Sequence, residues 1–226
     1  SGTNFGENRA IVGEPVGVFF IAEFAGIDEN GNEMIYDLDG NIVPLDAVNS
    51  VSERKVMGKP YPDFYGGIKN SFEYKNIGLD IFFVFSKGQM IYDDHGKRHV
   101  GNIGFGWNQD IRTLDYWQNN ESTTEIPTLS LNENRDLNSS RHLHDASYIR
   151  LRESSIYYNI PKNICKKIKV NNIKIFISGQ NLMVWTKYKG WDPEVNREGS
   201  GAITQGVSYL SPPQAKTFTT GINITL

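Results

Sequence analysis

The sequence predicts an all-β protein, and three observations favour a segment of an antiparallel transmembrane β-barrel. Segments of about 10 residues alternate apolar with small polar side chains, as barrel strands do. Short and long connections follow one another in turn along the chain. The last alternating segment, 216–226, ends with the chain. A soluble β-sandwich would use the same alternation to fill a core, so periodicity alone leaves both folds open.

The composition excludes several other classes of protein. A net charge of −3 gives no general attraction to nucleic acid. The single cysteine, Cys165, excludes an intrachain disulfide framework. No stretch approaches the roughly 18 apolar residues that a membrane helix needs. The 22 glycines and the 12% aromatic content suit strands joined by turns, and Ser1 is expected to be a start within a longer chain.

The first half of the chain contains three predicted strands. Val16–Ile27 is apolar on both faces at first, and the Asn30-Gly31 and Asp39-Gly40 pairs that follow are hairpin-turn signals. Gly66–Tyr74 and Leu79–Ser86 alternate on either side of a tight turn at Lys75-Asn76. Their apolar positions form one expected lipid-facing band, made of Phe72, Tyr74, Leu79, Ile81, Phe83 and Phe85.

The second half contains three more predicted strands. The segment from Ser147 to Ile160 alternates in two phases, and the change near Arg152–Ser155 predicts a β-bulge. A basic turn at 162–171 leads into the strand Asn172–Trp185. We expect this strand to pair with 216–226, whose other edge should stay open because its partner lies outside the sequence. The total of about six long strands cannot close a barrel of the large type.

The long connections are expected to lie on the outer side of the barrel. Residues 87–146 show little periodicity, which would count against a compact soluble domain but is normal for an outer barrel loop. The segments 28–65 and 187–214 are placed on the same side. The turns at 75–76 and 162–171 are expected on the periplasmic side.

Three long motifs between residues 58 and 194 resemble one known family. They are GKPYPDFYGG at 58–67, SSR through DASYIRL at 139–151, and SGQNL through TKYKGWDPE at 178–194. In this order they resemble the C-terminal part of SusC/RagA-family TonB-dependent outer-membrane transporters of Bacteroidetes. The chain departs from that pattern at Leu226, where the family usually ends in an aromatic residue.

The resemblance implies a nutrient importer of the bacterial outer membrane. It implies a plugged barrel of about 22 strands, of which residues 1–226 are one C-terminal segment. Implied partners are the rest of the barrel and the plug, outer-membrane lipid, a SusD-like surface lipoprotein, and TonB through an absent upstream segment. The implied substrate is an oligosaccharide or a peptide, and no cofactor or enzymatic activity is expected. A soluble carbohydrate-binding β-sandwich is the alternative.

Polar residues at the turns and in the long loop give no metal or catalytic site. The runs that begin at Asp28 and Asp37 place glycine at the fourth position, whereas a calcium loop needs it at the sixth, so turn chemistry is favoured. The four histidines have no cysteine or carboxylate at a zinc-ligand spacing. No serine sits in a nucleophile-elbow pattern.

Aromatic residues in the loops are the candidate ligand-binding residues. Aromatic faces stack on sugars and peptides, and loops carry binding residues. Trp185, at the end of its strand, is better explained as an interfacial anchor. The residues predicted to bind ligand are Trp107, Tyr116, Trp117, Tyr188 and Trp191.

Overall fold

The structure, a computed structural model, forms two compact units, both built mainly of strands. It describes residues 3–45, 53–104, 106–119, 123–129, 131, 138–197 and 204–226. Unit 1 comprises residues 1–62, 88–146 and 190–212, and unit 2 comprises residues 63–87, 147–189 and 213–226. Each unit is therefore assembled from three separate stretches of sequence.

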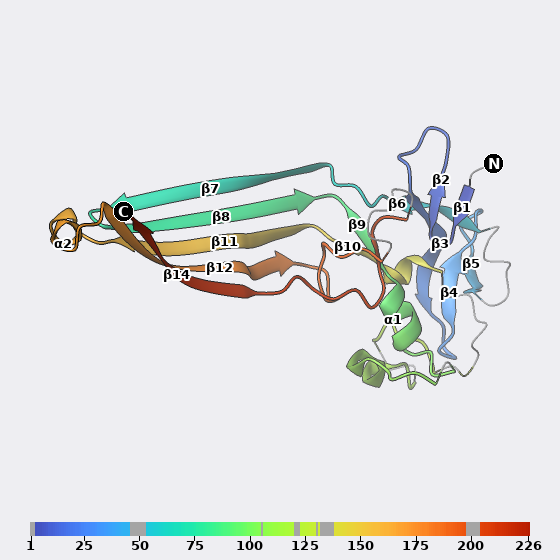
Figure 1. Cartoon of the computed structure of the whole chain (residues 1–226). Coiled ribbons are helices and arrows are strands. Elements are labelled where there is room, and N and C mark those ends of the chain that lie inside the picture. Colours follow the sequence, from blue (N-terminus) through green and yellow to red (C-terminus); the bar gives the residue numbers. More distant parts are fainter. Residues whose placement is uncertain are drawn as a thin grey trace. The chain divides into compact units, whose positions relative to one another are not determined.

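Unit 2 is a single antiparallel sheet of five long strands in the order β14-β12-β11-β8-β7 (Figure 1). Its strands are β7 (Phe64–Tyr74), β8 (Ile77–Lys87), β11 (Tyr148–Asn159), β12 (Asn172–Thr186) and β14 (Thr217–Thr225). A short helix, α2 (Lys162–Lys167), lies in the turn between β11 and β12. Two pairings in this sheet join strands that are separated by long connections, β8 with β11 across residues 88–147 and β12 with β14 across residues 187–216.

The strand register gathers apolar side chains on one face of this sheet. In one row across it, Phe72 faces Leu79, which faces Ile156, and Ile156 faces Ile177. The next row runs through Tyr74, Ile77, Tyr158, Ile175 and Ile222. Leu79 and Phe85 lie on one side of β8, which confirms that the predicted band shares a face. From Ile77 to Phe85 the band spans about 26 Å at about 3.3 Å per residue, close to the roughly 25 Å apolar band of membrane barrels.

The opposite face carries polar groups and flat aromatic rings. Ser71 Oγ donates to Asp80 Oδ1 at 2.6 Å, and the Lys174 ammonium lies 3.7 Å from the centre of the Tyr157 ring. The Tyr157 ring occupies the space where Gly78 would carry a Cβ, so a glycine on β8 lets the ring lie against the sheet. A sandwich would need a second sheet on the apolar face, and the described part of unit 2 holds one sheet.

The predicted β-bulge in β11 is confirmed. The register of β11 shifts between Leu151 and Glu153 against both of its neighbours, β8 and β12. The Arg152 side chain turns to Asn181 Oδ1, 3.0 Å away. The extra residue explains why the apolar positions of β11 change from odd to even numbers.

The ends of unit 2 also agree with the predicted alternation of short and long connections. The Asn159 amide donates to the Asn76 carbonyl at 2.8 Å, so the turns at 75–76 and 162–171 lie at the same end of the sheet. At that end Asn171 also bonds Thr225, and β14 pairs with β12 as predicted. Among the described residues, the other edge of β14 has no strand partner.

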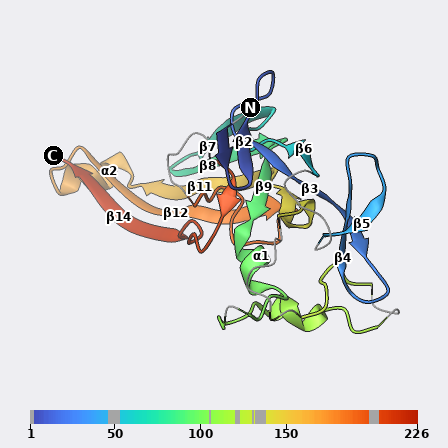
Figure 2. The ribbon, with the colours of Figure 1, turned by 90° about the vertical axis from the view of Figure 1, so that its right-hand side faces the viewer.

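Unit 1 is built of shorter elements (Figure 2). One sheet has the order β1-β2-β3-β4-β5, with β6 on β3, and a second has the order β10-β9-β13. The strands are β1 (Thr3–Phe5), β2 (Asn8–Ala10), β3 (Val18–Ile27), β4 (Glu33–Tyr36), β5 (Ile42–Pro44), β6 (Arg54–Gly58), β9 (Met90–Asp93), β10 (Leu143–Asp145) and β13 (Val207–Ser208). The helices are α1 (Asp94–His99) and the 3₁₀ segments Ile111–Asp115 and Ser140–His142.

Two sequence-based expectations are corrected by unit 1. The predicted strand Val16–Ile27 forms, as β3, but in the sheet of unit 1, so five strands rather than six share the long sheet. Its two apolar faces are explained by two buried clusters: Phe19 and Ile21 pack with Tyr92 and Val207, and Ala22 packs with Ile35 and Leu45. The described parts of residues 87–146 are not simply irregular, since they contain β9, α1 and β10.

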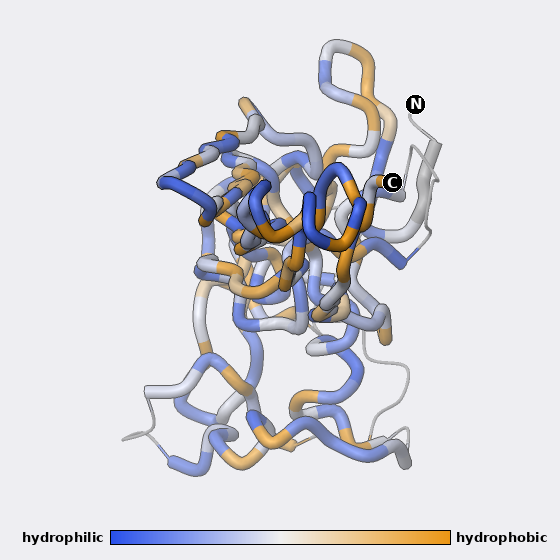
Figure 3. The backbone as a smooth tube through the Cα atoms, turned by 60° about the vertical axis from the view of Figure 1, so that its left-hand side comes forward, coloured by the Kyte–Doolittle hydropathy of each residue, from blue (hydrophilic) through white to orange (hydrophobic). Residues whose placement is uncertain are grey.

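No helix in the described ranges is long and apolar enough to cross a membrane. The backbone coloured by hydropathy shows short apolar segments interspersed with hydrophilic ones (Figure 3).

Candidate ligand site on helix α1

Helix α1 of unit 1 has strong local reasons to form despite its six residues. The Asp93 carboxylate accepts a hydrogen bond from the Gly96 amide at 2.8 Å, which caps the first turn. Asp94 lies in the first turn, and Lys97, Arg98 and His99 lie in the last turn. These charges complement the helix dipole at both ends.

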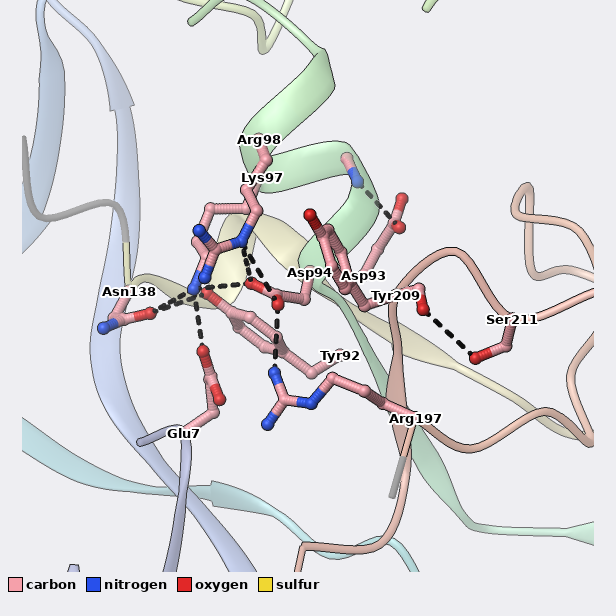
Figure 4. A network of polar contacts seen from close by, with 11 residues as sticks. Glu7, Tyr92, Asp93, Asp94, Lys97, Arg98, Asn138, Arg197, Tyr209 and Ser211 are labelled. Carbon is pink, nitrogen blue, oxygen red and sulfur yellow. Dashed lines mark hydrogen bonds and ion pairs between the residues drawn. The ribbon is translucent and has the colours of Figure 1, made fainter. Parts of the chain in front are cut away.

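A buried ion network fixes α1 to the rest of unit 1 (Figure 4). Asp94 lies 2.8 Å from Lys97 Nζ and 3.0 Å from Arg197 Nη1. Lys97 also bonds Glu7 Oε1 at 2.7 Å and Asn138 Oδ1 at 2.9 Å. Burial alone would raise the pKa of Asp94, but the charge and hydrogen bond of Lys97 and the charges of the arginines lower it. The helix is thus bonded to segments distant in sequence on both sides.

Four aromatic rings stack along one side of this helix. His95 and His99 are one turn apart, so their side chains meet, and their ring centroids are 4.4 Å apart. The Trp107 ring stacks on His99 with centroids 5.3 Å apart, and Trp191 lies 5.3 Å from His95. We call these four residues the aromatic stack. Its two tryptophans are about half exposed, whereas the histidines between them are mostly buried.

The polar surroundings define the state of the two imidazoles. His99 Nδ1 lies 2.9 Å from the Asn108 carbonyl, which can only accept, so Nδ1 carries a proton and donates this hydrogen bond. His95 Nε2 lies 3.7 Å from Asp110 Oδ2. Burial, the charge of His99 and that of Arg112 lower the pKa of His95 in spite of Asp93 and Asp110. The His95 ring is therefore neutral at pH 7.

Of the five residues predicted to bind ligand, the structure brings two together. Trp107 and Trp191 form the ends of the aromatic stack, although 83 positions separate them in sequence. Tyr116 and Trp117 follow the 3₁₀ segment Ile111–Asp115, and the Trp117 ring packs on Gly31. Tyr188 belongs to unit 2 and is buried.

Sequence reasoning missed His95 and His99 as members of this site. The signal that could have found them is the i, i+4 spacing of the two histidines after Asp93-Asp94, a helix-start pattern. Within the residues that the structure describes, no group of three histidine, cysteine or carboxylate side chains could hold a metal ion. Asp28 and Asp37 instead accept hydrogen bonds from their own turns, each bonding the backbone and side chain of an asparagine four positions later.

Known proteins are similar to this chain along nearly its whole length, although no protein-family model matches it. TonB-dependent receptor P3 of Formosa agariphila is 31% identical over 94% of this chain and 22% of its own length. TonB-dependent receptor SusC of Bacteroides thetaiotaomicron is 25% identical over 87% of this chain and 18% of its own length. A structure of the RagAB peptide transporter matches with a TM-score of 0.80 and 22% identity, over 97% of this chain and 24% of that one.

The chain is homologous to a segment of the SusC/RagA-type TonB-dependent receptors. It spans about a fifth of the length of the curated relatives it matches. The fold of this receptor segment is all-β, and the open sheet of unit 2 is a segment of an antiparallel transmembrane barrel wall. The relatives are receptors and transporters rather than enzymes.

Proposed function

We propose that this receptor segment belongs to a TonB-dependent importer of oligosaccharides or peptides in the bacterial outer membrane. The observation that carries the proposal is similarity to TonB-dependent receptors along nearly the whole chain, combined with an apolar face on the sheet of unit 2. The sequence relatives are TonB-dependent receptors, and RagAB is a peptide importer.

Unit 2 contributes part of the membrane-spanning wall. Its backbone donors and acceptors are paired between strands, as hydrocarbon requires. The edges at β7 and β14 need further strands, which the remainder of the barrel would supply. The polar face would then line the lumen, next to the plug, and the apolar face would contact outer-membrane lipid.

Unit 1 contributes the ligand-binding surface. Trp107 and Trp191 offer half-exposed aromatic faces, and the buried ion network around Asp94 holds the helix on which they stack. Such a rigid aromatic surface suits the stacking of a sugar ring or an aromatic peptide side chain. Tyr116, Trp117 and Tyr188 remain predictions as ligand contacts.

Two protein partners complete the proposal. A SusD-like surface lipoprotein would close the outer side, and TonB would act through a segment outside this sequence. The similarity of this chain to SusC and to the RagAB importer supports this pairing.

The experiment uses a strain that carries the intact polypeptide. Its growth is measured with single oligosaccharides, and then with peptides, as the carbon source. We expect deletion of the gene to abolish growth on one substrate class only, and loss of TonB to abolish growth on that class together with the substrates of other TonB-dependent receptors. The double change Trp107→Ala and Trp191→Ala should reduce growth on that same class while the receptor still reaches the membrane. Unchanged growth of the deletion strain on every substrate would contradict an importer function.

A further inference from the structure

Two carboxylates beside the aromatic stack, those of Asp93 and Asp94, are buried more deeply than the arginines Arg112 and Arg98 that they bind. The side chains of Asp93 and Asp94 are 3% and 1% exposed. Those of their partners Arg98 and Arg112 are 34% and 33% exposed. Buried carboxylates neutralise these arginines from beneath, but the surface beside the stack presents guanidinium groups.

Arg98 keeps most of its donors available. Its Nε–H donates a bifurcated hydrogen bond to the two carboxylate oxygens of Asp94, at 3.3 and 3.4 Å. Its terminal nitrogens make no hydrogen bond to a described residue. The guanidinium carbon lies 5.3 Å from the centre of the Tyr209 ring, and that ring lies 6.4 Å from His99. The Arg98 guanidinium therefore lies against Tyr209, which in turn lies beside His99 of the aromatic stack.

Arg112 occupies a corresponding position beside His95. It bonds both oxygens of Asp110, at 3.1 Å each, and its Nη1 lies 3.2 Å from Asp93 Oδ2. Asp110 is in turn the carboxylate beside His95. These bonds hold the guanidinium plane fixed while a third of the side chain remains in contact with solvent. These bonds use three of its five N–H donors, so two remain to bind a carboxylate or sulfate oxygen.

We propose that Arg98 and Arg112 make the aromatic stack selective for acidic sugars, whose rings carry a carboxylate or sulfate group. The inference rests on the proposed ligand-binding role of Trp107 and Trp191, and it adds the chemical class of the ligand. The sugar ring would stack on a tryptophan face, and its oxyanion would accept hydrogen bonds from the neighbouring guanidinium.

Two features favour an acidic sugar over an acidic peptide. The stack and its arginines offer side-chain contacts only, of the kind that suit a ring with one charged substituent. A peptide would in addition need partners for its own backbone donors and acceptors, such as a strand edge. The four rings of the stack belong to α1, to the loop residue Trp107 and to Trp191, none of which lies in a strand.

The test is isothermal titration of the intact polypeptide, purified in detergent, with two pairs of probes. One pair is a pentameric oligogalacturonide and its carboxyl-reduced neutral form. The other is a sulfated galactan oligosaccharide and its desulfated form, which distinguishes carboxylate from sulfate recognition. We expect at least one acidic probe to bind about ten-fold or more tightly than its neutral form, with an affinity that falls as salt rises.

The variants are Arg98→Gln and Arg112→Gln, with Lys55→Gln as the matched control. Lys55 is an exposed cation of unit 1 that pairs with Glu23 on β3 and lies outside the stack. Each arginine change should weaken the acidic probe about ten-fold and leave the neutral probe unchanged, whereas Lys55→Gln should alter neither. Arg98→Lys, which keeps the charge without the fork, checks that a loss does not come from misfolding, because it should recover part of the affinity.

The inference would be overturned by equal affinity for acidic and neutral forms, by no binding of either acidic probe, or by acidic binding that both arginine changes leave intact. Tighter binding of an Asp/Glu-rich peptide than of either acidic sugar would also overturn it. Failure of the proposed ligand-binding role of Trp107 and Trp191 looks different, because Trp107→Ala and Trp191→Ala would then leave every glycan affinity unchanged, and failure of the importer function shows as unchanged growth of the deletion strain. If those tryptophan changes abolish binding but the arginine changes do not, only the acidic selectivity is wrong.

Discussion

The imidazole rings of His95 and His99 lie 4.4 Å apart between centroids, with 21° between their planes. Two positive charges at this separation in a partly buried site would repel strongly. The charge of His99 is accordingly one cause of the lowered pKa of His95. Since Trp107 and Trp191 pack on either side of the pair, the charge of the histidines acts directly on the aromatic faces proposed to bind ligand.

Acidification should change the tryptophan emission of the stack. The pKa of His95 lies below its usual 6.5, so the ring is neutral at pH 7.5 and takes up a proton only as the pH falls below about 6.5. A protonated imidazole beside an indole quenches its fluorescence, so emission should fall in that window. The pKa of His95 is lower in the folded chain than in the unfolded chain, so the unfolded chain binds the proton at a higher pH. The stability of unit 1 therefore falls as the pH drops below about 6.5.

The measurement is a fluorescence titration from pH 8 to about 4.5, with His95→Gln as the comparison. His95→Gln should remove most of the change in emission. An unaltered titration curve in His95→Gln would show that the quenching group lies elsewhere.

Gly31 should be far less tolerant of a side chain than Gly40, although the two occupy equivalent turns. Both have positive φ, of 79° and 86°, so alanine costs about 1–2 kcal/mol of backbone strain at either position. A Cβ on Gly31 would also clash with Thr128 and lie 2.5 Å from the Trp117 ring, whereas one on Gly40 meets no atom. Overpacking adds about 1–3 kcal/mol. Hydrogen exchange of the β3 and β4 amides in the two variants measures the difference, and equal protection would contradict the packing of Trp117 on this turn.

Breaking the buried pair of Glu33 and Arg141 should destabilise unit 1. Arg141 Nε lies 3.0 Å from Glu33 Oε2, the side chains are 7% and 0% exposed, and Ser139 Oγ also donates to Glu33. Arg141→Met leaves a buried carboxylate without its cation, at a cost of about 3–5 kcal/mol. Adding Glu33→Leu removes that charge and should recover much of the loss. Proteolysis rates of the single and double variants test this, and a double variant less stable than the single one would count against the pair as the cause.

The sequence alone predicted the strands in which apolar and polar side chains alternate regularly. Alternation in β7, β8, β12 and β14 marked their strands and faces, and the change of phase near Arg152 marked the bulge, because each added residue reverses a strand face. The same reasoning could not place β3, since its pattern does not say which sheet it joins.

The candidate site was much less predictable, because its contacts are distant in sequence. Trp107 and Trp191 were identified by residue type, but the helix that joins them was not. Lys97 is held by Glu7 and Asn138, and Asp94 by Arg197, and such polar pairs leave no periodic pattern in the sequence. The stack exists only once these separate segments have been folded together.

An arginine should be tolerated on one face of unit 2 and not on the other. Ile81 lies midway along β8 on the apolar face, and Ser155 faces Asp80 on the polar face. Ile81→Arg should cost about 2–4 kcal/mol near the middle of the membrane, while Ser155→Arg should cost little. The amount of heat-modifiable folded receptor in outer-membrane fractions measures assembly. Similar yields of the two variants would contradict the assigned lipid face.

The orientation of the receptor segment can be tested by cysteine labelling of intact cells. The 75–76 and 162–171 turns lie at one end of the sheet of unit 2, and the short turns of membrane barrels face the periplasm.

Cys165, the natural cysteine, is buried in α2 and would first be replaced by serine. In that background a membrane-impermeant maleimide should label Leu114→Cys, in an exposed position of unit 1, and leave Asn76→Cys unlabelled. Disruption of the outer membrane should then expose Asn76→Cys, which shows that the turn is accessible from the periplasm. Labelling of Asn76→Cys on intact cells, with Leu114→Cys protected, would reverse the orientation and place the aromatic stack on the wrong side to capture an external ligand.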